Sequence, residues 1–470
     1  MSRLKSNIAY NFIYQFLILF LPFVTAPYLS RVIGAEGVGI YSYSYSVALY
    51  FTYFVVLGLN KYGNREIASC QKDFNRMSIV FSEIYEMQIL IFGVVFLVYI
   101  WYCFFIANDR EAALIQSMLV MSALFDINWF FWGMEQFKIT VTRNAVIKIA
   151  TVICIFVFVK DSSDVYKYIT IMAIGYFLSN ACLIFFSRKM VKFRPVPIRK
   201  ITRHIKPNLL LFIPVIAVSV YRIMDKVMLG GICDMAEVGY YENAEKIVNV
   251  PVALITAIGT VMLPRMTALV SQDKIDESKQ YIEKTMAFSL FFSTGAACGI
   301  IAVSKVFSIV YYGSTFEKSG VIMSLLAVSI IFLAGGDVIR SQFLIPNRYD
   351  RVYLISAIAG AIVNVVVNAL LIPVYGANGA AIGTICAEVM VFLIQFVFVL
   401  NKLPVKNYIV HEIRFLIAGI VMIMTLDRFV PVDLSNSLEC LIKRILIGAL
   451  VYITCVIVLY IKKVLKKRRV

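Results

Sequence analysis

Apolar runs of about 20 residues recur from one end of the chain to the other and constrain its fold more than any other feature. A run of that length, coiled as an α-helix, crosses roughly 30 Å of hydrocarbon. Charged residues make up 16% of the 470 residues, whereas soluble domains carry about 25%. We therefore predict an all-α polytopic membrane protein with about 14 transmembrane helices. The predicted spans are 8–29, 38–59, 80–106, 112–133, 145–159, 166–187, 208–230, 245–264, 285–311, 319–339, 352–372, 378–400, 413–426 and 445–461.

The basic residues that give the chain its net charge of +17 are unevenly distributed between the predicted loops. If the N-terminus is cytoplasmic, most lysines and arginines fall in cytoplasmic segments, and each of these segments contains two or more. Short cytoplasmic loops of membrane proteins carry this positive excess. We therefore predict that both termini are cytoplasmic and that the basic segment 466–469 binds anionic lipids. This distribution accounts for the charge, so we expect no nucleic-acid partner.

A basic segment with two prolines separates the sixth predicted span from the seventh. A short repeated string supports pseudo-symmetry between the flanking halves, because an Ala-Glu pair lies just before VGIY at 38–41 and VGYY at 238–241. Repeated bundles are typical of transporters that bind substrate at the repeat interface. We predict four parts: an N-terminal six-helix bundle at 1–190, a basic cytoplasmic linker at 191–206, a C-terminal six-helix bundle at 207–401, and an extra helix pair with a basic cytoplasmic tail at 402–470.

Sequence motifs of several common catalytic chemistries are absent from the chain. It contains no Gly-Lys dipeptide and therefore no Walker A loop, and it contains neither G-x-S-x-G nor H-E-x-x-H. His204 and His411 lie in predicted cytoplasmic loops, and the nine cysteines form no C-x-x-C pair. The predicted external loops are short, whereas a polysaccharide polymerase or ligase acting outside would need a larger external surface. We predict a transporter and not an enzyme, with no metal site and no cofactor.

Three charged residues, Arg222, Asp225 and Lys226, share one turn of the seventh predicted span. Spacings of three and four residues place both cations on one helix face with the carboxylate beside them. One interpretation is an intrahelical ion pair that makes the helix tolerable in lipid. The other is a cationic patch lining a cavity, in which Asp225 orients the cations and the planar arginine fork binds a diphosphate. The sequence leaves both interpretations open.

Other ionisable residues within or at the edges of spans are candidates for function, because charge is costly in a bilayer. Lys305 in the ninth span either reaches the headgroups or lines the cavity, and the same alternatives apply to Arg31 at a span edge. Glu388, near the middle of the twelfth span, is the best candidate for coupling to protons or cations, and the alternative is a buried packing residue. Asp126 and Asp337 are further coupling or ion-pair candidates, although they lie toward cytoplasmic span ends, where solvation offers a simpler explanation.

Several short strings resemble one family of membrane transporters. They are DKVMLG at 225–230, VGYYENA at 238–244, DINWFFWGMEQFK at 126–138, IPNRYDR at 345–351, YGANGAAIG at 375–383, and Ala387-Glu388. In these strings the chain resembles the Wzx-type flippases of O-antigen and capsule repeat units, the polysaccharide biosynthesis proteins of the MOP superfamily. That superfamily also contains the MATE drug exporters. The resemblance covers roughly residues 5–400.

The resemblance implies two six-helix bundles that form a V and give alternating access to a cationic cavity in the bacterial inner membrane. The implied substrate is an undecaprenyl-diphosphate-linked oligosaccharide, which moves from the cytoplasmic to the outer leaflet for O-antigen or capsular polysaccharide synthesis. Coupling to a proton or sodium gradient is implied as well. Membrane lipids, a polysaccharide polymerase and a chain-length regulator are the implied partners.

By position, Arg222, Asp225 and Lys226 match the charged seventh helix of this family, and Asp126 matches its fourth. Lys305 and Arg31 carry over only as cavity candidates, because the family's other charges vary in position. Fourteen spans exceed the twelve of many members, which leaves room for a flippase of lipid II or of a teichoic-acid precursor. A MATE-like drug or cation antiporter is the other transport alternative, and its cavity would contain mainly anionic residues.

Overall fold

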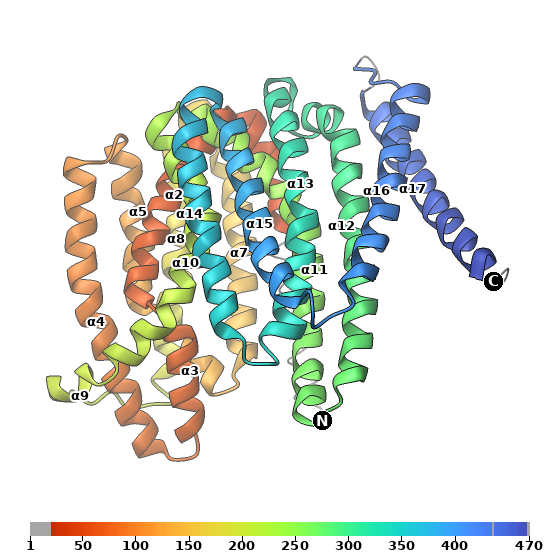
Figure 1. Cartoon of the computed structure of the whole chain (residues 1–470). Coiled ribbons are helices and arrows are strands. Elements are labelled where there is room, and N and C mark those ends of the chain that lie inside the picture. The colour runs from red at the N-terminus through yellow and green to blue at the C-terminus, as the bar shows by residue number, and fades with distance from the viewer. Residues whose placement is uncertain (1–19, 435–436, 468–470) are drawn as a thin grey trace. The chain divides into compact units, whose positions relative to one another are not determined.

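The computed structural model describes residues 20–434 and 437–467, and within these ranges every regular element is helical (Figure 1). Thirteen helices of the described chain are long and apolar enough to cross a membrane. They follow the second to fourteenth predicted spans in order, which confirms the prediction of an all-α polytopic membrane protein. The first predicted span, 8–29, is helical from residue 20 onward, and its earlier residues lie outside the described part. The count of fourteen therefore stays a prediction.

The chain divides into two compact units, and the division falls inside helix α10, after Ser219. The helices of the first unit are α2 (Gly34–Val56), α3 (Leu59–Cys70), α4 (Phe74–Phe105), α5 (Arg110–Ser122), α6 (Asn128–Gly133), α7 (Phe137–Phe158), α8 (Val165–Ser187), α9 (Ile198–Thr202) and the start of α10 (Ile205–Ile232). The basic segment 191–206, predicted as a linker, lies in this unit and contains α9. The predicted bundle boundaries remain predictions.

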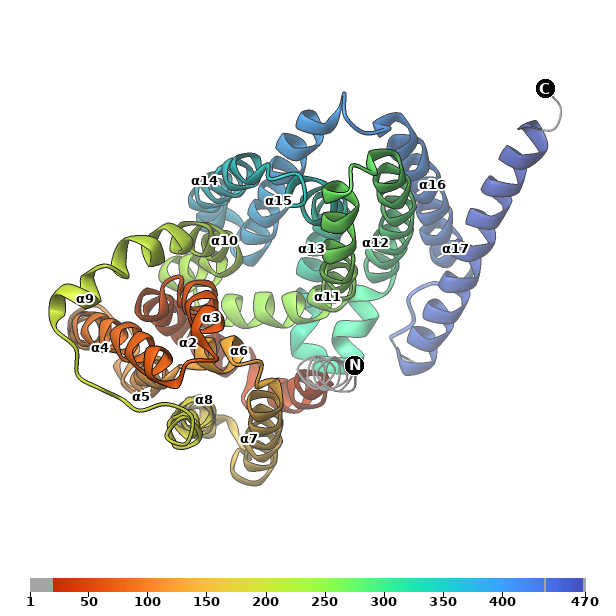
Figure 2. The same ribbon diagram turned by 90° about the horizontal axis from the view of Figure 1, so that it is seen from below.

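The second unit starts with the remainder of α10. Its further helices are α11 (Met235–Ser271), α12 (Ile275–Tyr312), α13 (Glu317–Ile339), the π-helical turn η4 (Arg340–Leu344), α14 (Asp350–Tyr375), α15 (Ala377–Val399), α16 (Val405–Phe429) and α17 (Ser437–Lys467). Helix α13 is the most buried span of this unit and contacts α11, α12 and α15. Helices α16 and α17, the predicted extra pair, pack against α12 (Figures 1 and 2).

Trp129 of α6 anchors the core of the first unit, where its indole is fully buried. Its ring nitrogen donates a hydrogen bond to the Gln88 side chain of α4 at 3.2 Å. Gly63 of α3 lies so close to the indole that a Cβ would come within 2.6 Å of it. The short helix α6 is therefore held between α3 and α4 by one large side chain and one glycine.

A tight turn at Gly376 joins α14 to α15 in the second unit. Gly376 has a φ of +56°, a conformation that glycine adopts without steric cost. The Glu237 carboxylate of α11 accepts a hydrogen bond from the Ala377 N–H at 2.9 Å and so satisfies a free donor at the start of α15. Further along the pair, Gly383 of α15 lies against Asn368 of α14. This close packing brings polar groups of both helices to the buried Asp225 of α10.

Candidate functional site

A polar pocket in the second unit gathers charged side chains from several helices, and we call it the charged pocket. Arg222 of α10, Asp337 of α13, Arg340 of η4 and Glu388 of α15 all line it. Its remaining lining residues are Thr256, Leu333, Gly336, Tyr353, Ala357, Val391 and Gln395. The sequence nominated Arg222, Asp337 and Glu388 separately, and the structure brings these three together. Two guanidinium groups and two carboxyl groups therefore share one pocket.

Asp337 is the carboxylate of the charged pocket that pairs directly with an arginine. Arg340 forms an ion pair with its Oδ1 atom, while Oδ2 is buried and has no hydrogen-bond partner among the described residues. Gly259 of α11 leaves the space that this carboxylate occupies, because a Cβ there would clash with Asp337 and Ser341. Arg222 is exposed, and it lies close enough to interact electrostatically with both Asp337 and Glu388.

The π-helical turn η4 sets the position of Arg340 directly after α13. Single π-turns within α-helices occur often at functional sites. The Gln342 amide of this turn is fully buried, and neither of its polar atoms has a partner among the described residues. The Gln395 carbonyl oxygen, which lines the charged pocket, is likewise unpartnered in the described chain. Buried polar atoms without partners are costly and are therefore candidates for binding a ligand or water.

A second polar centre surrounds the buried carboxylate of Asp225, and we call it the Asp225 centre. Four neutral side chains donate hydrogen bonds to this carboxylate. They are Tyr241 of α11 at 2.6 Å, Asn364 and Asn368 of α14 at 2.8 and 2.6 Å, and Thr384 of α15 at 2.6 Å. Both interpretations of the sequence paired Asp225 with the cations of its own helix. Its hydrogen bonds within the described structure go to other helices, so this carboxylate joins α10 to α11, α14 and α15.

Lys226 lies one residue further along α10 and turns to two carboxylates of α11. Its ammonium group lies 3.1 Å from Glu242 and 3.0 Å from Glu245. Lys246 also contacts Glu242, at 3.3 Å. Two lysines and two glutamates thus balance each other, which offsets the cost of charges in a membrane-spanning helix. Lys226 is therefore paired with α11, whereas Arg222 lines the charged pocket, although one of the two sequence interpretations put both cations in one patch.

The other nominated residues lie outside both centres. Lys305 of α12 pairs with Glu317 at 3.1 Å, and both side chains are more than half exposed. Arg31 is exposed on the first unit. Asp126, also in the first unit, accepts hydrogen bonds from the backbone and side chain of Asn128 at 3.2 and 2.6 Å and so caps the start of α6. This contact favours the structural interpretation of Asp126.

Sequence reasoning missed the neutral partners of Asp225. Asn364 and Asn368 are four residues apart in the apolar helix α14, so they share one face. Amides on one face of a membrane helix form hydrogen bonds across helices, and that spacing is the signal that could have identified them. Tyr241 and Thr384 carry no comparable signal, because single hydroxyl groups are common in membrane helices.

The chain matches the family model described as "Polysaccharide biosynthesis protein" over residues 4–270. It is 24% identical over 412 residues to the "Putative O-antigen transporter" of Shigella dysenteriae, covering 83% of this chain and 98% of that protein. It is 22% identical over 420 residues to the protein of the same name from Escherichia coli (strain K12), covering 85% and 97%. It is also similar over half its length to the "Probable low-salt glycan biosynthesis flippase Agl15" of Haloferax volcanii, at 21% identity.

Solved structures with a similar fold are transporters as well. The lipid II flippase MurJ in an inward closed conformation superposes with a TM-score of 0.78 at 16% identity, covering 97% of this chain and all of that one. An inward-facing multidrug resistance MATE transporter of the MOP superfamily gives a TM-score of 0.57 at 12% identity, covering 87% and 99%. These likenesses establish the fold. Because the family model matches more than half of the sequence, this chain is a multi-pass membrane protein that belongs to the polysaccharide biosynthesis protein family.

Proposed function

We propose that this protein is a flippase that moves an undecaprenyl-diphosphate-linked oligosaccharide from the cytoplasmic to the outer leaflet of the bacterial inner membrane. The product would serve O-antigen or capsular polysaccharide synthesis, with a polymerase and a chain-length regulator as downstream partners. The match to proteins named as O-antigen transporters over nearly their whole length carries this proposal. In this proposal both termini are cytoplasmic, as the distribution of basic residues in the sequence suggests.

The charged pocket supplies the chemistry that such a substrate needs. Arg222 and Arg340 line it together, and arginine forks can donate two parallel hydrogen bonds to a phosphate group. Their positive charge is partly balanced by Asp337 and Glu388, so an arriving diphosphate would compete with these carboxylates for the guanidinium groups. Binding of the anion and release of the carboxylates are then linked. Through this exchange of partners, substrate binding would change the ion pairs of the pocket.

The Asp225 centre is our proposed site of coupling to a cation gradient. Its carboxylate, amide and hydroxyl groups are the kind of oxygen donors that hard cations prefer. The Asn368 carbonyl oxygen is buried without a partner in the described chain, and rotation of the amides would present further oxygens to an arriving cation. A proton is the other candidate for the same carboxylate. Sodium and proton gradients applied separately would distinguish them.

Charge reversal at Arg222 tests the proposal most directly. Proteoliposomes containing the purified protein and a fluorescent lipid-linked oligosaccharide report flipping as loss of protection from an external quencher. We expect Arg222→Glu to slow flipping by about tenfold or more, the worth of one hydrogen bond to a charged group. Lys443→Glu is the matched control, because Lys443 is an exposed cation on α17 that pairs with Glu439. Equal flipping by wild type and Arg222→Glu would contradict the proposal.

Competition in the same assay separates the transport alternatives. An unlabelled O-antigen or capsule precursor should slow flipping of the labelled substrate. Stronger inhibition by lipid II or by a teichoic-acid precursor would move the assignment to those substrates. Inhibition by lipophilic cations, together with insensitivity to lipid diphosphates, would instead indicate a MATE-like antiporter.

A further inference from the structure

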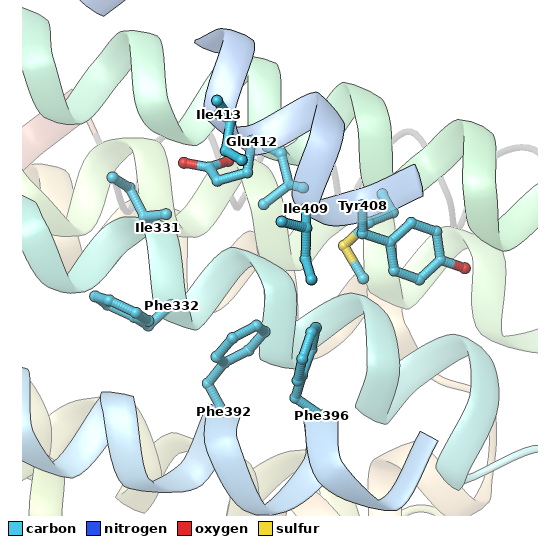
Figure 3. Close-up of a pocket in the computed structure, with 10 residues that line it drawn as sticks. Ile331, Phe332, Phe392, Phe396, Tyr408, Ile409, Glu412 and Ile413 are labelled. Carbon is cyan, nitrogen blue, oxygen red and sulfur yellow. The ribbon is translucent and has the colours of Figure 1, made fainter. Parts of the chain in front are cut away.

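An apolar pocket separate from the charged pocket lies between four helices of the second unit (Figure 3). We call it the aromatic pocket, because Phe332 of α13 and Phe392 and Phe396 of α15 form much of its wall. Its other lining residues are Met286, Leu290, Ile331, Tyr408, Ile409, Glu412 and Ile413. Its cavity volume is about 170 Å³, which is smaller than a pocket that encloses a whole drug-sized ligand and leaves room for part of a chain. The proposed function uses none of these residues.

Besides the Tyr408 hydroxyl, the Glu412 carboxyl group is the polar group of this apolar wall. One of its oxygens accepts a hydrogen bond from Thr294 of α12 at 3.0 Å, whereas Oε2 is buried and has no partner among the described residues. Figure 3 shows the carboxyl group on the side of the pocket where Ile331 lies, while Phe392 and Phe396 point from α15 toward Ile409. A buried carboxylate oxygen in apolar surroundings requires a donor. The Tyr408 hydroxyl of the same wall is also buried without a partner among the described residues, but it points away from Glu412 in Figure 3. The Glu412 oxygen therefore lacks a donor within its reach, and a positively charged donor would stabilise it most.

The pocket faces the membrane and lies near one end of the helices. Ile409 and Ile413 at its mouth are 46% and 50% exposed, and such side chains on a membrane-spanning helix contact lipid. Phe396 lies in the last turn of α15, and Tyr408 lies in the first turn of α16, on either side of a short connection. The distribution of basic residues in the sequence predicts that this end is cytoplasmic. A ligand from the inner leaflet can therefore enter past Ile409 and Ile413, place its head at Glu412, one turn further into α16 than Tyr408, and lay a chain along the aromatic rings.

We propose that the aromatic pocket binds a phospholipid with a primary ammonium headgroup, whose ammonium donates to Glu412 and whose acyl chain lies against Phe332, Phe392 and Phe396. The Glu412 carboxylate requires a positively charged donor, which the ammonium supplies. The aromatic rings provide an apolar surface for the acyl chain. An anionic lipid would be repelled by Glu412 of α16 and by Glu283 of α12, which accepts a hydrogen bond from Asn407 of α16 at 2.8 Å. A trimethylammonium lipid supplies charge but no N–H donor.

Lipid retention by the full-length protein tests this proposal independently of flipping. The protein is equilibrated in nanodiscs with equal amounts of phosphatidylethanolamine, phosphatidylcholine and phosphatidylglycerol, then released into detergent, and its retained lipids are counted by native mass spectrometry. We expect wild type to retain the ethanolamine lipid about tenfold over the other two, the worth of one hydrogen bond to a charged group. Glu412→Gln should lose this preference. Glu439→Gln, at an exposed glutamate of α17, should keep it.

A second variant removes the space and leaves the carboxylate in place. Leu290→Trp would fill the part of the pocket that the acyl chain occupies, and we expect it to reduce retention of all three lipids. Equal headgroup preference in wild type and Glu412→Gln would overturn the proposal, as would unchanged retention in a folded Leu290→Trp protein. Displacement of the ethanolamine lipid by undecaprenyl phosphate, which carries no ammonium group, would also overturn it and would assign the pocket to the polyprenyl chain of the transport substrate.

Discussion

Asn368 donates a hydrogen bond from Nδ2 to the Oδ1 atom of Asp225 at 2.6 Å, although 143 residues separate them in the sequence. The same Asp225 oxygen also accepts from Asn364. With Tyr241 and Thr384 on its other oxygen, the carboxylate receives four donors, all of them neutral. It is therefore able to exchange these donors for a cation.

Asp225→Asn should uncouple transport from the gradient. The amide removes the negative charge and presents N–H groups where the carboxylate oxygens accept hydrogen bonds, so we expect flipping driven by the coupling ion to fall at least tenfold, as for loss of a hydrogen bond to a charged group. Proteoliposomes with an imposed sodium or proton gradient provide the measurement. Asp276→Asn, at an exposed position in the first turn of α12, is the control. Full gradient dependence in Asp225→Asn would refute this assignment.

Glu388→Gln distinguishes the charged pocket from the Asp225 centre. Glu388 lies among two arginines and Asp337, and its carboxylate forms no direct ion pair within the described part of the chain. If it takes up a proton when a diphosphate draws Arg222 away, Glu388→Gln should make flipping insensitive to a proton gradient while a sodium response through Asp225 persists. Glu317→Gln, an exposed glutamate of α13 paired with Lys305, should behave as wild type. Unchanged proton dependence in Glu388→Gln would exclude this role.

A matched pair of glycines tests the packing that forms the charged pocket. A Cβ on Gly259 would clash with Asp337 and Ser341, whereas a Cβ on Gly299 would meet open space. We expect Gly259→Ala to destabilise the protein by about 1–3 kcal/mol through overpacking. Gly299→Ala should be neutral or stabilising by up to about 1 kcal/mol because alanine favours the helix. Apparent melting temperatures in detergent give the comparison, and equal shifts in the two variants would contradict the predicted clash.

Most of the fold is predictable from hydropathy because a membrane helix needs a long apolar run. The exceptions are instructive. The spans predicted at 145–159 and 413–426 are the full-length helices α7 and α16. Charged residues such as Arg143 and Glu412 lie in these helices just before the predicted spans, and a helix continues through such residues when the backbone hydrogen bonds are kept inside the segment.

The candidate site was less predictable, because its contacts join distant parts of the sequence. Charges in spans could be identified one by one, but their partners could not. His204 shows the same limit in the first unit. It lies in the turn between α9 and α10, where a loop was predicted, but the sequence did not indicate that its side chain is buried between Tyr62, at 2.6 Å, and Glu83, at 3.0 Å. Tertiary packing, which periodicity does not encode, decides which polar side chains meet.

Arg444→Lys should weaken the C-terminal helix pair. The sequence places Arg444 just before the fourteenth predicted span, yet its side chain is almost fully buried. Its guanidinium donates to the Ala302 carbonyl of α12 at 3.0 Å, and to the Val430 carbonyl and the Asp427 carboxylate at the end of α16, both at 2.6 Å. One residue of α17 therefore joins three segments.

Lysine keeps the charge but has a single nitrogen, which cannot reach all three acceptors in this geometry. At least one buried acceptor then loses its donor, which costs about 1–3 kcal/mol. We expect a lower apparent melting temperature in detergent and faster hydrogen exchange in α16 and α17, with the charged pocket unaffected. Lys443→Arg, one residue earlier on the exposed face, controls for the substitution itself. Equal hydrogen exchange of α16 and α17 in Arg444→Lys and Lys443→Arg would contradict the proposal that the Arg444 guanidinium holds α17 to α12 and α16.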